Sequence, residues 1–200
     1  MRLTIALVGA HAAGKSTLGS ALAAGLGVPF HDEIGRRLLA TRVPGRRAAD
    51  AQESFDAEVF EAELARDADF TGPLRVVETW HPGNLAYAAR RSPRVAARYY
   101  GLAFHDALIL PVHASVATRR ARQNEPGDPH FFEAVGRDAE TQALALGLRV
   151  LAPVLNDGAL APSVATALAR VRRAVAAGRG FWASHIDDPL KTCINSLEQQ

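Results

Sequence analysis

The amino-acid sequence predicts an α/β fold in which a parallel sheet is covered by helices on both faces. Short apolar segments alternate along the 200 residues with longer segments of helical periodicity. This alternation is typical of parallel strands joined by crossover helices. The first strand and the first helix enclose a glycine-rich loop at residues 9–14. No internal repeat or linker divides the chain before its last segment, and its length suits one domain.

Residues 9–17 read Gly-Ala-His-Ala-Ala-Gly-Lys-Ser-Thr, which is a complete phosphate-binding loop. The apolar segment Leu3–Val8 precedes it, and Lys15–Leu26, with leucines at helical spacing, follows it. Glycines let the backbone curl so that N–H groups face the phosphates at a helix N-terminus. We expect Lys15 to reach the β- and γ-phosphates of ATP and the Ser16 hydroxyl to bind Mg²⁺. The predicted ATP contacts are Gly9, His11, Ala12, Ala13, Gly14, Lys15, Ser16 and Thr17.

Lysine usage supports this assignment. The chain has 23 lysines and arginines, and only Lys15 and Lys191 are lysines. A chain that strongly favours arginine thus places a lysine at the loop position where a compact ammonium group is needed.

The elements after the first helix follow from periodicity and from breaking residues. Pro44-Gly45 and Thr71-Gly72-Pro73 end helices, and Pro82 and Pro93 suit the first turns of two others. In chain order we expect a short strand at Phe30, helices over 33–41 and 47–70, a strand over 74–78, helices over 82–91 and 93–102, and a strand over 107–112. A helix over 115–122, a polar loop over 123–129, a helix over 131–146, a strand over 148–154 and a helix over 162–177 complete the domain.

The segment 178–200 differs from the domain, which we place at residues 1–177. Asp188-Pro189 is a good helix start, and apolar residues then recur at helical spacing. We expect a short tail helix that packs on the domain or at a contact between two copies of the chain.

Composition restricts the function classes. The net charge is +2 and no dense basic run is present, so composition alone does not indicate nucleic-acid binding. The single Cys193 excludes an internal disulfide and a multi-cysteine zinc site. No apolar stretch reaches the length of a membrane span, and no signal peptide is recognisable. We therefore expect a cytoplasmic protein without a membrane partner.

The segment Glu78–Tyr87 resembles, in register, the acidic-Arg-aromatic and Leu-Ala-Tyr segment of thymidylate-kinase-like enzymes. Deoxynucleoside kinases have Glu-Arg-Ser at the same strand end. Residues 119–132 resemble the lid of this superfamily, and residues 154–158 its turn beside the adenine. The resemblance covers about residues 1–175 and implies a three-layer P-loop NTPase fold of the nucleotide-kinase type, with a short lid.

Four residues are the catalytic candidates. Lys15 belongs to the loop, and Glu78 ends a strand at the edge where open α/β sheets bind ligands. There Glu78 can accept the proton of an attacking hydroxyl or orient a Mg²⁺-bound water. Arg119 and Arg122 share a helix face just before the polar loop, where they can neutralise the transferring phosphoryl group.

The acceptor-binding candidates are Glu33, Arg36, Trp80 and Tyr87. Glu33 and Arg36 follow the second strand, where related kinases hold the acceptor, and Trp80 can either stack on a planar base or pack in the core. Thr79 stands where the resembling kinases have arginine. This departure favours a modified nucleotide, an unphosphorylated nucleoside or another small hydroxyl compound.

The sequence therefore predicts a Mg-ATP-dependent kinase acting on a small acceptor, most naturally a nucleoside or nucleoside monophosphate. One alternative is a kinase of another small molecule or of polynucleotide 5′-hydroxyl groups. A polynucleotide would require a continuous basic groove, and the arginines scattered between residues 42 and 98 leave this alternative open. An alternative of another class is a nucleotide-dependent switch or repair ATPase, in which the lid contacts a partner.

Overall fold

The computed structural model describes residues 2–41, 49–104, 106–123 and 128–182. Its strands are β1 (Leu3–Val8), β2 (Phe30–His31), β3 (Leu74–Glu78), β4 (Ala107–His113), β5 (Arg149–Val150) and β6 (Val154–Leu155). All pairs are parallel, in the order β2-β3-β1-β4-β5, and β6 also pairs with β4. The predicted parallel sheet is confirmed.

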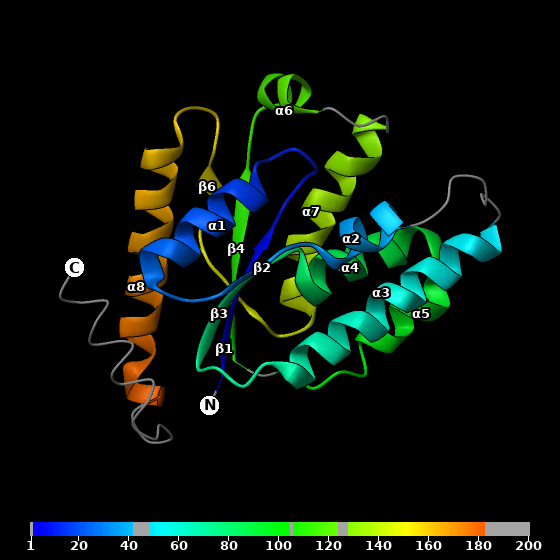
Figure 1. Ribbon diagram of the computed structural model, residues 1–200, viewed down its shortest axis with the longest axis horizontal. Coiled ribbons are helices and arrows are strands. Elements are labelled where there is room, and N and C mark those ends of the chain that lie inside the picture. The colour runs from blue at the N-terminus through cyan, green and yellow to red at the C-terminus, as the bar shows by residue number, and fades with distance from the viewer. Residues whose placement is uncertain (1, 42–48, 105, 124–127, 183–200) are drawn as a thin grey trace.

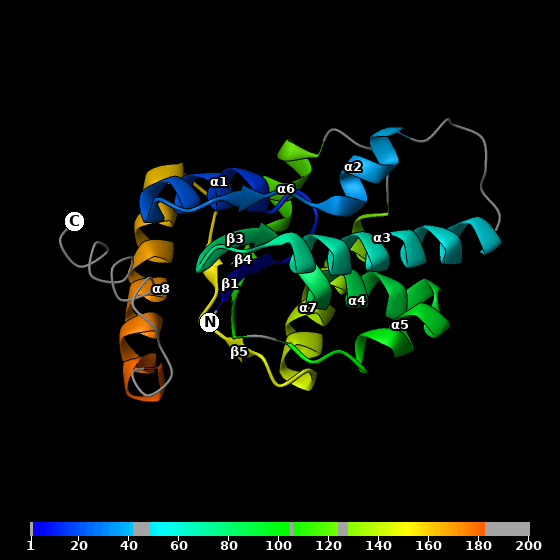
Figure 2. The ribbon, with the colours of Figure 1, turned by 60° about the horizontal axis from the view of Figure 1, so that its bottom comes forward.

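Eight helices surround the sheet within the described residues. They are α1 (Lys15–Leu26), α2 (Ile34–Thr41), α3 (Ala49–Asp69), α4 (Trp80–Arg91), α5 (Pro93–Tyr99), α6 (Val116–Arg122), α7 (Pro129–Ala145) and α8 (Leu160–Trp182). Figures 1 and 2 show α1 and α8 on one side of the sheet and α3, α4, α5 and α7 on the other. This arrangement is the three-layer α/β fold that the sequence predicts.

The alternating side chains of β1 explain how the central strand supports both layers. Ile5 and Leu7 pack with Leu18 and Leu22 of α1, whereas Ala6 and Val8 face the opposite side with residues of α4 and α7. Every residue of β1 is buried, as expected for a strand with helices on both faces. The central strand is thereby fixed, and with it the start of the loop that follows.

The predicted strand over 148–154 is wrong in one respect, because two short strands replace it. The N–H of Leu151 still donates to the carbonyl of Ile109 at 2.8 Å. Beyond it the carbonyls of Ala152 and Pro153 accept hydrogen bonds from Arg170 of α8, and Pro153 has no N–H to donate. The ladder is therefore interrupted before β6 resumes it.

The end of the domain also differs from the predicted bounds. Helix α8 begins at Leu160 and continues to Trp182, across the boundary expected at residue 177. The expected tail helix after Asp188 lies outside the described residues. Within the described part of the chain, none of the helices combines the length and hydropathy that crossing a bilayer requires.

Candidate active site

The loop between β1 and α1 adopts a backbone that its two motif glycines make possible. Gly9, Ala12 and Gly14 have φ angles of 144°, 61° and 86°, a region that residues with a Cβ rarely adopt. A Cβ on Gly9 would lie 2.3 Å from the carbonyl oxygen of Val112, and one on Gly14 2.4 Å from Nδ2 of Asn156. Both glycines are therefore needed for conformation and for space.

The loop ends at an uncapped helix N-terminus. No side chain caps α1 at Gly14, and the first bond of the helix runs from the N–H of Leu18 to the carbonyl of Gly14. The N–H groups of Lys15, Ser16 and Thr17 precede that bond and have no acceptor within the helix. Together with the helix dipole they form a place for an anion such as phosphate.

Lys15 lies folded against the loop. Its side-chain nitrogen donates to the carbonyls of Gly9 and Ala10, each at 3.1 Å, and the residue is buried. The ammonium group is thus already held beside the N–H groups that would bind phosphate.

Arg36 of α2 joins the loop to the carboxylate at the end of β3. Its guanidinium donates to Oγ of Ser16 at 3.1 Å and to Oε1 of Glu78 at 2.9 Å. It also pairs with Oε2 of Glu33 at 3.0 Å. Glu78 is 1% exposed, so its charge is buried with a hydrogen-bonded partner. Three predicted site residues and the Mg²⁺ candidate Ser16 are therefore in one cluster.

The cluster also bears on the predicted Mg²⁺ site. The Ser16 hydroxyl and the buried Glu78 carboxylate both accept hydrogen bonds from Arg36, so their oxygen atoms lie near the same positive charge. Oxygen atoms of this kind are the ligands that Mg²⁺ prefers. The residues present fit a magnesium ion held by Ser16 and, directly or through water, by Glu78. Asp106, another acidic residue next to a strand, precedes β4 and so lies at the opposite end of the strands from Glu78.

Tyr87 of α4 lies next to this cluster. Burial raises the pKa of its hydroxyl, and the negative charges of Glu33 and Glu78 act in the same direction. The Arg91 guanidinium lies 5.0 Å from the centre of its ring and Phe131 of α7 lies 6.0 Å away. Aromatic and charged side chains thus meet beside the carboxylate.

The two arginines of the predicted lid are placed differently from one another. Arg122 donates to the carbonyl of Ala13 in the loop at 3.4 Å. Arg119 donates through Nε to the carbonyl of Ala114 at 3.2 Å and lies 3.7 Å from Glu133. Its side chain is only 11% exposed, so Arg119 is held against the rest of the domain. The centre of the predicted lid, residues 124–127, lies outside the described residues.

Helix α7 packs against the phosphate-binding loop. The ring of His11 stacks on Phe132 with centres 4.7 Å apart. A Cβ on Gly136 would lie 2.5 Å from the backbone nitrogen of Ala10, so only glycine allows this close approach. The sequence contains these residues, but nothing in their spacing indicated the contact.

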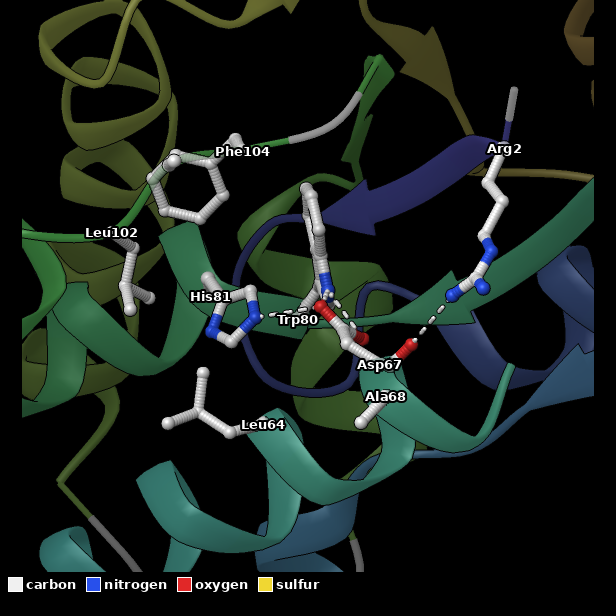
Figure 3. Close-up of a pocket in the computed structure, with 9 residues that line it drawn as sticks. Arg2, Leu64, Asp67, Ala68, Trp80, His81, Leu102 and Phe104 are labelled. Atoms are coloured by element: carbon white, nitrogen blue, oxygen red, sulfur yellow. Dashed lines mark hydrogen bonds and ion pairs between the residues drawn. The ribbon is translucent and has the colours of Figure 1, made fainter. Parts of the chain in front are cut away.

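The structure does not bring Trp80 to the cluster. Its ring is buried and its Nε1 donates to the Asp67 carboxylate at 3.1 Å. It lines a separate pocket of about 240 Å³ with His81 and Phe104, and Figure 3 shows the ring nitrogens of Trp80 and His81 turned toward Asp67. Thr79 and Trp80 have φ angles of 68° and 50°, a sharp turn that directs the indole away from Glu78. Core packing, the alternative that the sequence left open, is the observed role.

Glu63, Asp67 and His81 near this pocket are close enough to hold a metal ion. Asp67 already pairs with Arg75 at 2.5 Å, and Glu63 pairs with Arg66 and accepts from Asn84. Because the arginines neutralise both carboxylates, this cluster acts as a buried polar network that connects α3, β3 and α4.

Asn156 is the residue of this site whose role sequence reasoning missed. It follows β6, is 3% exposed, and donates through Nδ2 to the carbonyl of Ala13 at 2.9 Å. The only signal in the sequence was its place in the segment 154–158, which resembled the adenine turn of nucleotide kinases.

Comparisons with known proteins agree with this architecture. Deoxyadenosine kinase from M. mycoides with bound dCTP superimposes with a TM-score of 0.55 at 10% identity, over 85% of this chain and 99% of that chain. Shikimate kinase from Aquifex aeolicus vf5 gives a TM-score of 0.54 at 14% identity, over 86% and 98%. At these identities the likeness concerns the fold. A sequence comparison with curated proteins gives no match.

The fold and the loop define a P-loop protein with the architecture of nucleoside and nucleotide kinases. A family model described as an AAA domain matches residues 4–127. The match spans more than half of the chain, and the protein therefore belongs to this AAA-domain family.

Proposed function

We propose that the protein is a Mg-ATP-dependent phosphotransferase that moves the γ-phosphoryl group to a hydroxyl of a small acceptor, a nucleoside or nucleoside monophosphate. The observation that carries the proposal is the cluster of Ser16, Arg36 and Glu78, because it places a buried carboxylate beside the phosphate-binding loop. A switch ATPase only has to position a water for hydrolysis, whereas a kinase must also bind a second substrate. The rings of Tyr87 and Phe131 lie 6.0 Å apart near this carboxylate and are our candidates for the contact with that substrate.

The residues divide the reaction between them. Glu78 accepts the proton of the acceptor hydroxyl while the oxygen of that hydroxyl forms a bond to the γ-phosphorus of ATP. The bond between the γ-phosphorus and the bridging oxygen breaks, and ADP leaves with that oxygen. Lys15 and Arg122 lie at the loop, where they neutralise the charge of the transferring group. A magnesium ion held by Ser16 and, through water, by Glu78 would supply charge neutralisation on the phosphate oxygens.

The acceptor side supports a flat, hydroxyl-bearing molecule. Tyr87 and Phe131 are aromatic, and Glu33 and Arg36 offer an acceptor and several donors of hydrogen bonds. Thr79 provides no cation where related kinases have arginine, which favours an acceptor without a phosphate at that position.

The experiment is transfer of radiolabelled γ-phosphate from ATP onto a panel of nucleosides, nucleoside monophosphates, shikimate-like hydroxy acids and oligonucleotides. Transfer to one member of the first two groups is expected. Lys15→Ala should reduce it by about 10²–10³, the usual effect of losing one preorganised charge. Glu61→Gln is the matched control, because Glu61 is an exposed acid that pairs with Arg98 far from the loop.

The panel also separates the alternatives. The family match to an AAA domain favours ATP hydrolysis as the second candidate, and hydrolysis without transfer to any acceptor would support it. Transfer to oligonucleotides alone would support a polynucleotide kinase. Arg90, Arg91 and Arg98, which could line a basic groove, are paired with Asp138, Asp56 and Glu61.

A further inference from the structure

One carbonyl of the phosphate-binding loop is held from outside the loop. The carbonyl of Ala13 accepts a hydrogen bond from Nδ2 of Asn156 at 2.9 Å and a longer one from Arg122 at 3.4 Å. Asn156 is itself fixed, because its backbone N–H donates to the carbonyl of His113 at 2.8 Å. A buried side chain on a fixed backbone therefore sets the position of this carbonyl.

The orientation of the carbonyl determines the orientation of the next N–H group. No described peptide bond is cis, and in a trans peptide the C=O and the following N–H point in opposite directions. With Asn156 on the carbonyl side of the Ala13–Gly14 peptide, the N–H of Gly14 points away from Asn156. This N–H belongs to the motif segment whose amides bind phosphate in P-loop proteins.

We propose that Asn156 is a positioning residue of the nucleotide site, which presets the Gly14 N–H for phosphate by holding the Ala13 carbonyl. The inference rests on the proposed nucleotide binding at the loop. Arg122 shares the carbonyl but also has to act on the transferring phosphoryl group. Asn156 has no such second role, and its backbone N–H is held by the carbonyl of His113.

The chemistry of the position requires an amide. A carbonyl oxygen can only accept, so the residue opposite it must donate, and asparagine does so without a charge. The side chain also packs directly on Gly14, where a Cβ would lie 2.4 Å from Nδ2. In Asn156→Asp, a carboxylate would face the Ala13 carbonyl and would favour rotation of the peptide.

The same corner of the chain also holds the lid helix. Asp157 accepts a hydrogen bond from the backbone N–H of Ser115 at 2.5 Å, just before α6. This bond lowers the pKa of Asp157, with Thr118 adding a second hydrogen bond. Two consecutive side chains after β6 thus fix the loop amide and the start of the helix that carries Arg122.

The test measures binding of inorganic tripolyphosphate by calorimetry, because this probe contacts the loop without a base. Asn156→Ala should weaken its binding at least tenfold, and Asn156→Asp more strongly at pH 7. Ser163→Ala is the matched control. Ser163 is 4% exposed and donates to the carbonyl of Leu155 at 3.1 Å, so its loss removes a buried hydrogen bond near the same corner without touching the loop. Thermal unfolding should shift similarly in Asn156→Ala and Ser163→Ala, with tripolyphosphate affinity lost only in the former.

The outcomes are distinguishable. Absence of tripolyphosphate binding by the unchanged protein would contradict the proposed function itself. Normal binding by that protein and by both Asn156 variants would overturn only the positioning role. An equal loss of affinity in Ser163→Ala would assign the effect to general stability of the corner and would also overturn it. If neither Asn156 variant folds, the residue is required for the stability of the fold, and the positioning role is overturned as well.

Discussion

Glu78 is buried at the end of β3, where its carboxylate accepts a hydrogen bond from Arg36. The same guanidinium also donates to the hydroxyl of Ser16. Glu78→Gln keeps the shape of the side chain but removes the proton acceptor. We expect kcat to fall by about 10²–10⁴, the range of general-base effects, with ATP affinity changed only a few-fold. Steady-state kinetics and calorimetry of ATP binding measure the two quantities.

Glu33→Gln is the control for this substitution, since it removes the other carboxylate that pairs with Arg36 and leaves Glu78 intact. Its effect should appear in the KM of the acceptor. A Glu78→Gln variant with normal turnover would show that the carboxylate has no catalytic role.

Arg36 occupies the place between the two groups proposed to hold magnesium. At an effective dielectric of about 20, two unit charges about 4 Å apart interact by about 4 kcal/mol, so the guanidinium opposes a metal ion there. Arg36→Ala should therefore lower the Mg²⁺ concentration needed for half-maximal ATP binding by about fivefold or more, measured by calorimetry without acceptor.

Arg37→Ala provides the comparison for Arg36. Arg37 is the next residue of α2, is 59% exposed in its side chain and pairs with Asp32 at 3.5 Å, so its removal changes the charge of the helix by the same amount. An equal shift of the half-maximal Mg²⁺ concentration in the two variants would show that the effect comes from the net charge of α2 and not from the position of Arg36.

At the scale of elements, the sequence predicted what depends on local patterns. The loop, β1, α1 and β3 have the predicted bounds because buried strands and motif glycines leave a local signature. The interruption between β5 and β6 was missed because Arg170, twenty residues from Val150, competes for the carbonyls. The contacts of Asn156 and Gly136 with the loop join segments more than 120 residues apart in sequence, and periodicity carries no such information.

The same division holds for the cluster that we propose to be catalytic. That Glu78 lies at the ligand-binding edge was predictable, since a strand end fixes the edge of the sheet. The sequence did not predict that Arg36, rather than the residue after Glu78, supplies the cation. The position of Arg36 depends on how α2 packs above the strand ends, which local patterns do not determine. The position of Trp80 depended on the backbone turn at Thr79, where a β-branched residue has a positive φ, which such residues rarely adopt.

Helix α6 provides a test of the lid arginines. Arg122→Ala should lower kcat at least 100-fold, as expected for a charge-neutralising arginine, with the free energy of unfolding changed by less than about 0.5 kcal/mol. Arg119→Ala should lower kcat and, in addition, lower the free energy of unfolding by about 1 kcal/mol. The Arg119 side chain is mostly buried and hydrogen-bonded to Ala114. Kinetics and urea unfolding separate the two effects.

Arg120→Ala is the control on the same helix, since Arg120 is exposed. It should change neither quantity. If Arg122→Ala were as active as the unchanged protein, the lid helix would act only in stability. We also predict that the amide hydrogens of residues 123–129, a segment whose centre lies outside the described residues, exchange more slowly when both substrates are bound.

At the scale of the whole molecule, the buried network around Asp67 holds the layer opposite α1 together. The Asp67 carboxylate accepts from Arg75 of β3 at 2.5 Å, and from Trp80 and His81 of α4 at 3.1 Å and 2.9 Å. Asp67 itself belongs to α3, so one carboxylate joins two helices and a strand. It lies at the amino edge of the sheet, near Arg2 and Phe104, away from the phosphate-binding loop.

This network makes stability depend on acid pH. Although burial raises the pKa of Asp67, the hydrogen bond and charge of His81 together with Arg75 lower it to about 2. A group with a lowered folded-state pKa stabilises the protein fully above its unfolded-state pKa and loses that effect as the pH falls through the folded value. We therefore expect Asp67 to contribute about 2 kcal/mol at neutral pH, lost between about pH 4 and pH 2.

In Asp67→Asn the loss at neutral pH should be larger, about 3 kcal/mol, because Arg75 remains buried without its charge partner. Asp138→Asn, which breaks the partly exposed pair with Arg90, should cost less than about 1 kcal/mol. Urea unfolding from pH 7 to pH 2 tests this directly: if unchanged protein and Asp67→Asn lost stability in parallel over the acid range, the carboxylate would not be the group that titrates, and the network would stabilise the fold by packing alone.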